Sequence, residues 1–99
     1  MRPARPWAVL VVRERVVYPD GGLVEMVVWR VPEPVPPTGH GLKYCLVYVV
    51  DGERIVGYDN ERGKGDHRHD RASEEPYAFE SVERLLADFL ADVNRERSS

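Results

Sequence analysis

Valine-rich runs, interrupted by short turn signals, fill the first part of the chain and predict β-strands. Residues 7–18 and 23–31 are two such runs. Pro19-Asp20-Gly21-Gly22 separates them, and its proline and glycines favour a tight turn. The pattern therefore predicts a first hairpin, with strands at about residues 7–18 and 23–31.

Residues 42–50 and 53–59 predict a second hairpin, because Asp51-Gly52 between them is a strong turn signal. A two-residue loop makes Val50 pair with Glu53. Counting back along the ladder gives three further predicted pairs: Lys43 with Asn60, Tyr44 with Asp59, and Cys45 with Tyr58. Cys45 lies in mid-strand, so we expect it to pack in the core and not to act as a nucleophile.

A proline-rich connector joins the two hairpins, and a helix ends the chain. Residues 32–37 hold four of the eight prolines, which predicts a stiff extended segment. It leads into a flexible corner that contains His40. The helix is predicted at about residues 81–96, with Ser81 as N-cap. Its apolar positions recur at helical spacing: Val82, Leu85, Leu86, Phe89, Leu90 and Val93.

These elements predict an α+β fold, in which an antiparallel sheet of about four strands, made of two sequential hairpins, packs on one C-terminal helix. Ninety-nine residues are too few for a second core, so residues 1–99 form a single domain. One helix covers only one face, yet several strands are apolar on both sides. The sheet is therefore expected either to curl on itself or to bind a partner, as a homodimer or a hetero-complex.

Composition excludes several classes of protein. A formal net charge of -3 argues against a protein that coats nucleic acid by net charge alone. The single cysteine rules out an internal disulfide and a cysteine-rich zinc site. No stretch approaches the roughly 20 apolar residues that span a bilayer. Arg13-Glu14-Arg15 cuts short the apolar run after the basic N-terminus, which argues against a signal peptide. A cytoplasmic protein is expected.

The polar stretch of residues 60–75 is the candidate functional segment. Its two glycines and few apolar residues predict a mobile loop. His67 and His69 are candidates for acid–base catalysis on a phosphodiester, and Asp59 or Asp66 would orient a histidine. Candidate residues for binding phosphate or RNA are His40, Lys43, Tyr44, Tyr58, Arg62, Lys64 and Arg68. This chemistry needs no cofactor.

Three other interpretations of this stretch remain open. It is a solvated surface loop with incidental histidines, or it binds RNA or a protein without catalysis. Alternatively it supports a metal-dependent nuclease, in which case His67, His69 and Asp66 are the candidate ligands for Zn²⁺ or Mn²⁺. The histidine spacing of i, i+2 is not the usual helical zinc spacing of i, i+4.

Several segments together resemble the TumE family of prokaryotic type II toxin–antitoxin modules. They are His40-Gly41-Leu42-Lys43-Tyr44, the run from Gly57-Tyr58-Asp59-Asn60 to His67-Arg68-His69, Tyr77-Ala78-Phe79, and the Leu-Leu-Ala-Asp-Phe helix. The resemblance covers about residues 7–95. It implies a cytoplasmic toxin that a cognate antitoxin of the helix-turn-helix type neutralises. Many toxins of comparable size are ribonucleases, which favours RNA as the target by analogy.

Overall fold

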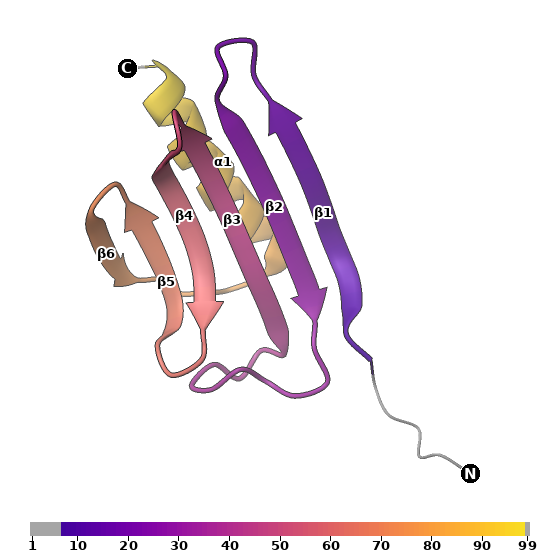
Figure 1. Cartoon of the computed structure of the whole chain (residues 1–99). Coiled ribbons are helices and arrows are strands. Elements are labelled where there is room, and N and C mark those ends of the chain that lie inside the picture. The colour runs from indigo at the N-terminus through magenta and orange to yellow at the C-terminus, as the bar shows by residue number, and fades with distance from the viewer. Residues whose placement is uncertain (1–6, 99) are drawn as a thin grey trace.

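One antiparallel sheet of six strands forms the body of the molecule, with its strands in sequence order (Figure 1). The computed structural model describes residues 7–98, and the basic segment before Trp7 lies outside this range. The elements are β1 (Val9–Val17), β2 (Leu23–Arg30), β3 (Leu42–Val50), β4 (Glu53–Glu61), β5 (Gly65–Asp70), β6 (Ser73–Pro76) and α1 (Val82–Ser98). No helix within the described range is long and apolar enough to cross a membrane.

The predicted α+β class with one C-terminal helix on an antiparallel sheet is confirmed, but the prediction of about four strands is wrong. The predicted loop at residues 60–75 contains β5 and β6, which continue the sheet beyond β4. Gly63 and Gly65 both take positive φ, as the tight turn between β4 and β5 requires. The sequence did not predict β5, because its residues are polar and lack the alternation of apolar and polar positions that indicates a half-buried strand.

The register of the second hairpin differs by one residue from the prediction. Val50 pairs with Glu53 as expected, but the register shifts between Tyr48 and Val49, because β4 contains an extra residue there. Cys45 consequently lies opposite Asp59 instead of Tyr58. Neither Tyr44 with Asp59 nor Lys43 with Asn60 forms the predicted pair. A bulge of this kind cannot be seen in a turn signal two residues long.

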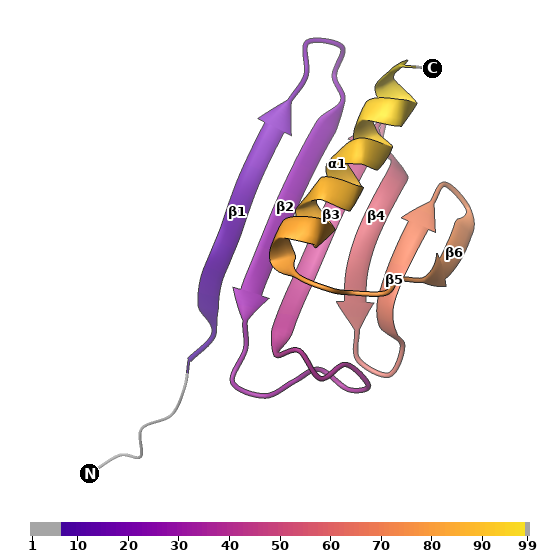
Figure 2. The ribbon, with the colours of Figure 1, turned by 180° about the vertical axis from the view of Figure 1, so that it is seen from behind.

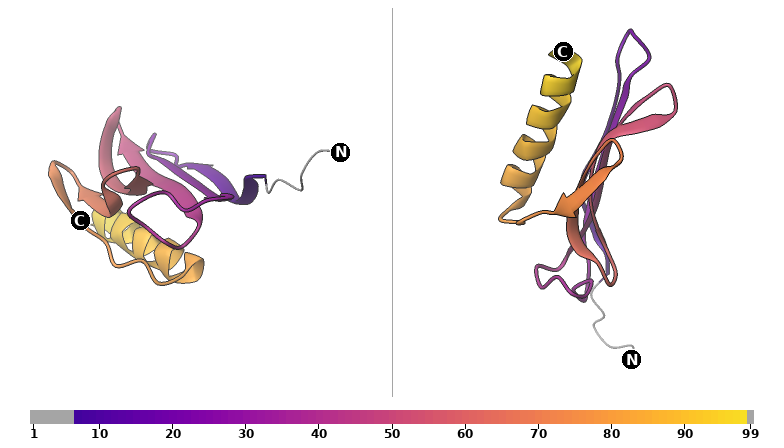
Figure 3. Two further views of the ribbon diagram at one scale, coloured as in Figure 1. Left: turned by 90° about the horizontal axis from the view of Figure 1, so that it is seen from below. Right: turned by 90° about the vertical axis from the view of Figure 1, so that its left-hand side faces the viewer.

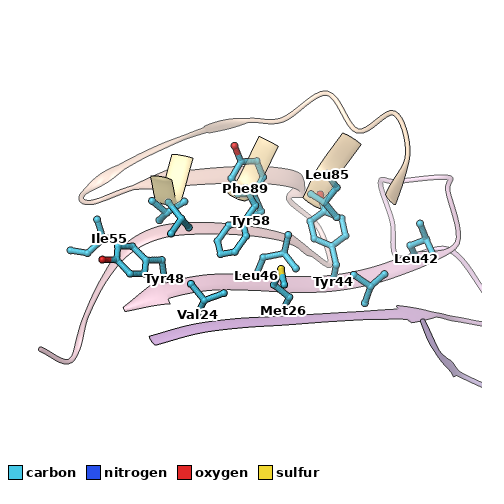
Figure 4. Packing of buried hydrophobic residues seen from close by; sticks show 13 residues of the cluster. Val24, Met26, Leu42, Tyr44, Leu46, Tyr48, Ile55, Tyr58, Leu85 and Phe89 are labelled. Atoms are coloured by element: carbon cyan, nitrogen blue, oxygen red, sulfur yellow. The ribbon is translucent and has the colours of Figure 1, made fainter. Parts of the chain in front are cut away.

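The core lies between the sheet and α1 (Figure 4). Alternate residues of β2, β3 and β4 point towards the helix, since successive side chains of a strand face opposite sides. Leu85, Phe89 and Val93 of α1 are fully buried against them. Ser81 accepts a hydrogen bond from the Arg84 amide at 3.0 Å, which confirms the predicted N-cap.

The other side of the sheet, which we call the open face, carries no helix (Figure 3, right). Cys45 is exposed on this face, so the prediction that it packs in the core is wrong. α1 lies over the middle of the sheet and leaves β1 uncovered (Figure 2). Val9 and Val17 of β1 are 51% and 65% exposed. The sheet therefore does not curl enough to bury its first strand.

Candidate functional site

The end of β4 distributes three consecutive polar residues over the two faces of the sheet. Tyr58 and Asn60 are buried on the helix side. Asp59 lies between them and points to the open face, because side chains alternate along a strand. The same alternation in β5 sends His67 and His69 to the open face, and Asp66 and Arg68 to the helix side. The predicted site residues are thus divided between two surfaces.

Five residues form a group on the open face, which we call the open-face cluster: Arg54, Asp59, His67, His69 and Glu74. Asp59 lies opposite His67 in the β4–β5 ladder, and Gly57 lies opposite His69. His69 Nε2 is 3.3 Å from an Asp59 carboxylate oxygen and 3.7 Å from a Glu74 carboxylate oxygen. An Arg54 guanidinium nitrogen lies 3.1 Å from His69 Nδ1.

These contacts assign a tautomer to each histidine of the cluster. A guanidinium only donates hydrogen bonds, so His69 Nδ1 accepts from Arg54 and the ring proton is on Nε2, facing the carboxylates. In His67, Nδ1 lies 2.9 Å from the Gly65 carbonyl oxygen and must donate to it. In the neutral ring, His67 Nε2 therefore carries the lone pair, and within residues 7–98 no group binds it. His67 is the histidine of the cluster whose second ring nitrogen is open to a ligand.

Cationic side chains also lie in and near the β4–β5 turn and on β3. Lys64, in the β4–β5 turn, donates a hydrogen bond of 3.2 Å to Glu74. This bond raises the pKa of Lys64 and lowers the pKa of Glu74. Lys43 is exposed on β3 opposite Trp29, and Arg62 is exposed in the same turn as Lys64. Exposed cations therefore lie on the open face and in the adjoining turn, together with the carboxylates of Asp59 and Glu74.

A second group, the corner cluster, lies at the other surface and comprises His40, Tyr44 and Asp66. Asp66 Oδ1 accepts from the Tyr44 hydroxyl at 2.5 Å and lies 2.9 Å from His40 Nε2. Burial and then the hydrogen bond to Asp66 raise the pKa of Tyr44. The His40 ring also stacks on Phe79, with centroids 4.1 Å apart. These contacts fix the corner after the proline-rich connector to β5 and to the segment that precedes α1.

A third group attaches the helix to the sheet, and we call it the helix cluster: Tyr58, Arg68 and Asp92. Asp92 accepts from the Tyr58 hydroxyl at 2.5 Å and from Arg68 at 2.8 Å. Burial by itself raises the pKa of Asp92, but hydrogen bonds from Arg68, Tyr58 and Arg95 outweigh it and hold that pKa below its usual value. Tyr58 and Arg68 are thus engaged by a buried carboxylate, and a phosphate would have to displace it.

The structure separates several residues that the sequence grouped together. Asp66 lies on the opposite side of the sheet from His67 and His69, so the three proposed metal ligands do not converge. In the part of the chain that is described, no group of three His, Cys, Asp or Glu side chains is arranged to hold a metal ion.

Five residues that contact these groups were missed: Arg54, Gly57, Glu74, Phe79 and Asp92. Only pairing of β5 with β4 and β6, or packing of α1, could have identified them.

A cleft of about 390 Å³ lies elsewhere, at the C-terminal end of α1. Its wall includes Asp20, Tyr48, Val50, Asp51, Glu53, Ile55, Arg71, Glu96 and Arg97. None of the predicted site residues lines it. Arg71 is paired with Glu96 at 2.9 Å and Arg97 with Asp20 at 3.1 Å, so its two cations are already neutralised. The cleft lining contains no histidine, so the open-face cluster, with two imidazoles beside carboxylates, is the better candidate for acid–base chemistry.

Comparison with known proteins gives one result. A family model described as Toxin TumE matches residues 3–97, nearly the whole chain. No significant match was found among curated proteins or among solved structures. The matched range includes all six strands, all but the last residue of α1, and each of the three clusters. The chain belongs to the TumE family of toxins.

Proposed function

We propose that this chain is the toxin of a type II toxin–antitoxin module and that it cleaves RNA as a metal-independent endoribonuclease. Membership of the TumE family supports the role as a toxin. The observation that carries the chemistry is the placement of His67 and His69 on one face of one strand, beside Asp59. Residues at i and i+2 of a strand have Cα atoms about 6.6 Å apart, so two imidazoles can flank one phosphate.

His67 is the general base in this proposal. Its Nε2 takes the proton of a ribose 2′-hydroxyl, and the 2′ oxygen then forms a bond to the adjacent phosphorus. The bond from phosphorus to the 5′ oxygen breaks, and that oxygen takes a proton from the imidazolium form of His69. The products are a 2′,3′-cyclic phosphate and a 5′-hydroxyl. Asp59 and Glu74 stabilise the imidazolium by their negative charge.

The cations of the open face stabilise the charge that develops on the phosphorus oxygens. Arg54 is the nearest cation to the histidines, at 3.1 Å from His69. When phosphate attracts Arg54 away, His69 Nδ1 becomes available for a proton. Lys43 and Lys64 hold the RNA backbone on either side. His40, Tyr44, Tyr58, Asp66 and Arg68 face the helix side, and we assign them to the stability of the fold.

The partner in this proposal is a cognate antitoxin in the cytoplasm, for which the family resemblance favours a helix-turn-helix protein. The exposed valines of β1 give such a partner an apolar surface to cover. The exposed apolar area by itself does not distinguish a different protein from a second copy of the chain, since either would bury it.

The first prediction tests the site. The double variant His67→Ala/His69→Ala is expected to abolish growth inhibition and RNA cleavage, while circular dichroism and thermal unfolding show a folded protein. Growth of cells that express the chain without antitoxin, and cleavage of a defined RNA, are the measurements. Arg84→Ala, on the helix side, where Arg84 pairs with Asp88 at 2.9 Å, is the control and should stay toxic. Full toxicity of the double variant would refute the assignment, and inhibition of wild-type cleavage by a chelator would favour a metal-dependent nuclease.

One observation favours a second candidate, a module that binds RNA without cleaving it. Both ring nitrogens of His69 have partners, as in a histidine that only supports structure. This alternative predicts saturable RNA binding that weakens steeply with salt, and intact RNA after long incubation. Appearance of a cyclic phosphate end on the RNA separates the two.

A further inference from the structure

β1 is a long free edge of the sheet. It has nine residues, and among residues 7–98 it pairs only with β2, so within this range no strand lies along the other side of its backbone. Val9, Leu10, Val11, Val16 and Val17 are all between 37% and 65% exposed. Natural sheets protect such an edge with proline, a short strand, a covering segment, a β-bulge or charged side chains. β1 contains no proline and α1 does not reach over it (Figure 2), but β1 has a bulge between Leu10 and Val12 and charged residues at its centre.

The direction of each backbone group of β1 follows from the hairpin turn. The Tyr18 amide donates to the Gly22 carbonyl at 2.8 Å, so Tyr18 is bonded towards β2. Hydrogen bonding alternates along an antiparallel pair. Counting back from Tyr18, every second residue of β1 therefore has its backbone amide and carbonyl directed to β2. These residues are Val16, Glu14 and Val12. The other set points to the free edge: Arg13, Arg15 and Val17.

Three charges lie in the middle of this edge. Arg13 and Arg15 have their side chains on the open face, and Glu14 has its side chain on the helix side. Arg15 is paired with Glu25 of β2 at 3.0 Å. Within residues 7–98, Arg13 and Glu14 form no ion pair. An incoming strand would meet a basic, acidic, basic series that is flanked by valines.

A second copy of the chain does not complement this series. Two β1 strands related by a two-fold axis would pair antiparallel, with their edge-facing residues opposite one another. Of the registers centred on the charges, one puts Arg13 opposite its own copy and one puts Arg15 opposite its own copy. The third puts Glu14 opposite its own copy and Arg13 opposite Arg15. Like charges directly opposite destabilise a pair, so each of these registers is unfavourable.

We propose that the β1 edge binds an extended segment of a different protein, which adds a seventh strand to the sheet. That segment carries an acidic, basic, acidic series between apolar residues, so that its acids meet Arg13 and Arg15 and its base meets Glu14. Main-chain hydrogen bonds provide affinity and the charges provide selectivity. The inference deepens the partner part of the proposed function and does not depend on ribonuclease activity.

A peptide experiment on the full chain tests this proposal. The probe is a nine-residue peptide in which a central Glu-Lys-Glu is flanked by valine and threonine, and the control peptide carries Lys-Glu-Lys instead. NMR titration is expected to shift the β1 resonances with the first peptide, and to slow exchange of the amides of Arg13, Arg15 and Val17. The Glu14 amide, already directed to β2, should change its exchange little. The control peptide should bind about tenfold more weakly, because three charge pairs become repulsive.

Two variants extend the test. Arg13→Pro removes an edge-facing amide and should abolish binding, whereas Arg13→Ala keeps the amide and should only weaken it. Inverting the three charges (Arg13→Glu, Glu14→Lys, Arg15→Glu) should reverse the preference between the peptides. Equal binding of both peptides, or no binding of either, would overturn the proposal. So would a dimer of the free chain that protects the same amides. RNA cleavage enters none of these measurements, so the proposed ribonuclease can fail independently.

Discussion

Tyr58, Asp59 and Asn60 are consecutive, yet each belongs to a different group of contacts. Tyr58 binds Asp92 of the helix, and Asp59 lies beside His69 on the open face. Asn60 is fully buried and bridges to β3: its side-chain oxygen accepts from the Tyr44 amide at 2.9 Å, and its side-chain nitrogen donates to the Leu42 carbonyl at 2.6 Å. The three residues are adjacent in the sequence, but in the structure each makes contacts with a different part of the molecule.

Asn60 should be important for stability. Asn60→Ala removes two buried hydrogen bonds and leaves an amide and a carbonyl of β3 unsatisfied, each at a cost of about 1–3 kcal/mol. We expect the free energy of unfolding to fall by roughly 2–4 kcal/mol, measured by urea denaturation. Arg62→Ala, exposed two residues further on, should change it by less than about 0.5 kcal/mol. A loss at Asn60 as small as at Arg62 would contradict this account.

Gly57 makes room for the contact between Arg54 and His69. A Cβ at Gly57 would lie 2.9 Å from Arg54 Cδ, too close for the side chain to remain in place. Gly57→Ala is therefore expected to break the hydrogen bond from Arg54 to His69 Nδ1. The ¹⁵N chemical shifts of the His69 ring measure this loss. Gly39→Ala, where no atom lies within 4 Å, is the matched control and should leave those shifts unchanged.

At the scale of elements, α1 is attached by polar contacts on one flank as well as by its apolar stripe. Asp92 binds Tyr58 and Arg68 from β4 and β5, and Asp88 accepts from the Tyr77 hydroxyl at 2.6 Å. Phe89 of α1 packs edge-on against Tyr58 of β4, with ring centroids 6.0 Å apart (Figure 4). The helix therefore has a defined rotation over the sheet.

This attachment predicts a loss of stability in acid. The folded-state pKa of Asp92 is lowered, so the carboxylate binds fewer protons when folded than when unfolded. Its contribution is present above the unfolded pKa, near 3.8, and is lost as the pH falls through the lower folded value. The free energies of unfolding of the wild type and of Asp92→Asn, measured by urea denaturation, should become equal as the pH falls through this window. Above it, the wild type should be the more stable of the two. Parallel pH profiles would show that Asp92 does not contribute.

At the scale of the whole molecule, charges of both signs meet on the open face. The chain is acidic, with a formal charge of -3, and the open face carries Lys43, Arg54 and Lys64 together with the carboxylates Asp59 and Glu74. RNA binding should accordingly depend on a few local contacts and on salt.

The salt dependence gives a quantitative test. Log affinity falls as log salt rises, and each phosphate contact on a single strand contributes about 0.7 to the steepness of this fall. If Lys43 contacts a phosphate, Lys43→Gln should make the fall less steep by about 0.7. Fluorescence anisotropy with a short RNA at several salt concentrations measures it. Arg84→Gln removes a cation from the helix side, where Arg84 pairs with Asp88 at 2.9 Å, and should leave the slope unchanged. A lower slope for both variants would show that binding follows overall charge.

The sequence by itself determined the elements whose signals are local. Two hairpin turns, the helix from its capping serine to its apolar stripe, and the family follow from runs of a few residues. It also identified Asp59, His67 and His69 as candidates, because polar residues in such density have no role in a core.

Only the tertiary structure decided which of these residues meet. β5 is a strand because β4 and β6 pair with it, although its own residues are almost all polar. An extra residue in β4 set the register that no turn signal encodes. Alternation along β4 and β5 then separated the histidines of the open face from Asp66, and brought in Arg54 and Glu74 from neighbouring strands. Facing and pairing depend on contacts between distant segments, so they arise only when the sheet forms.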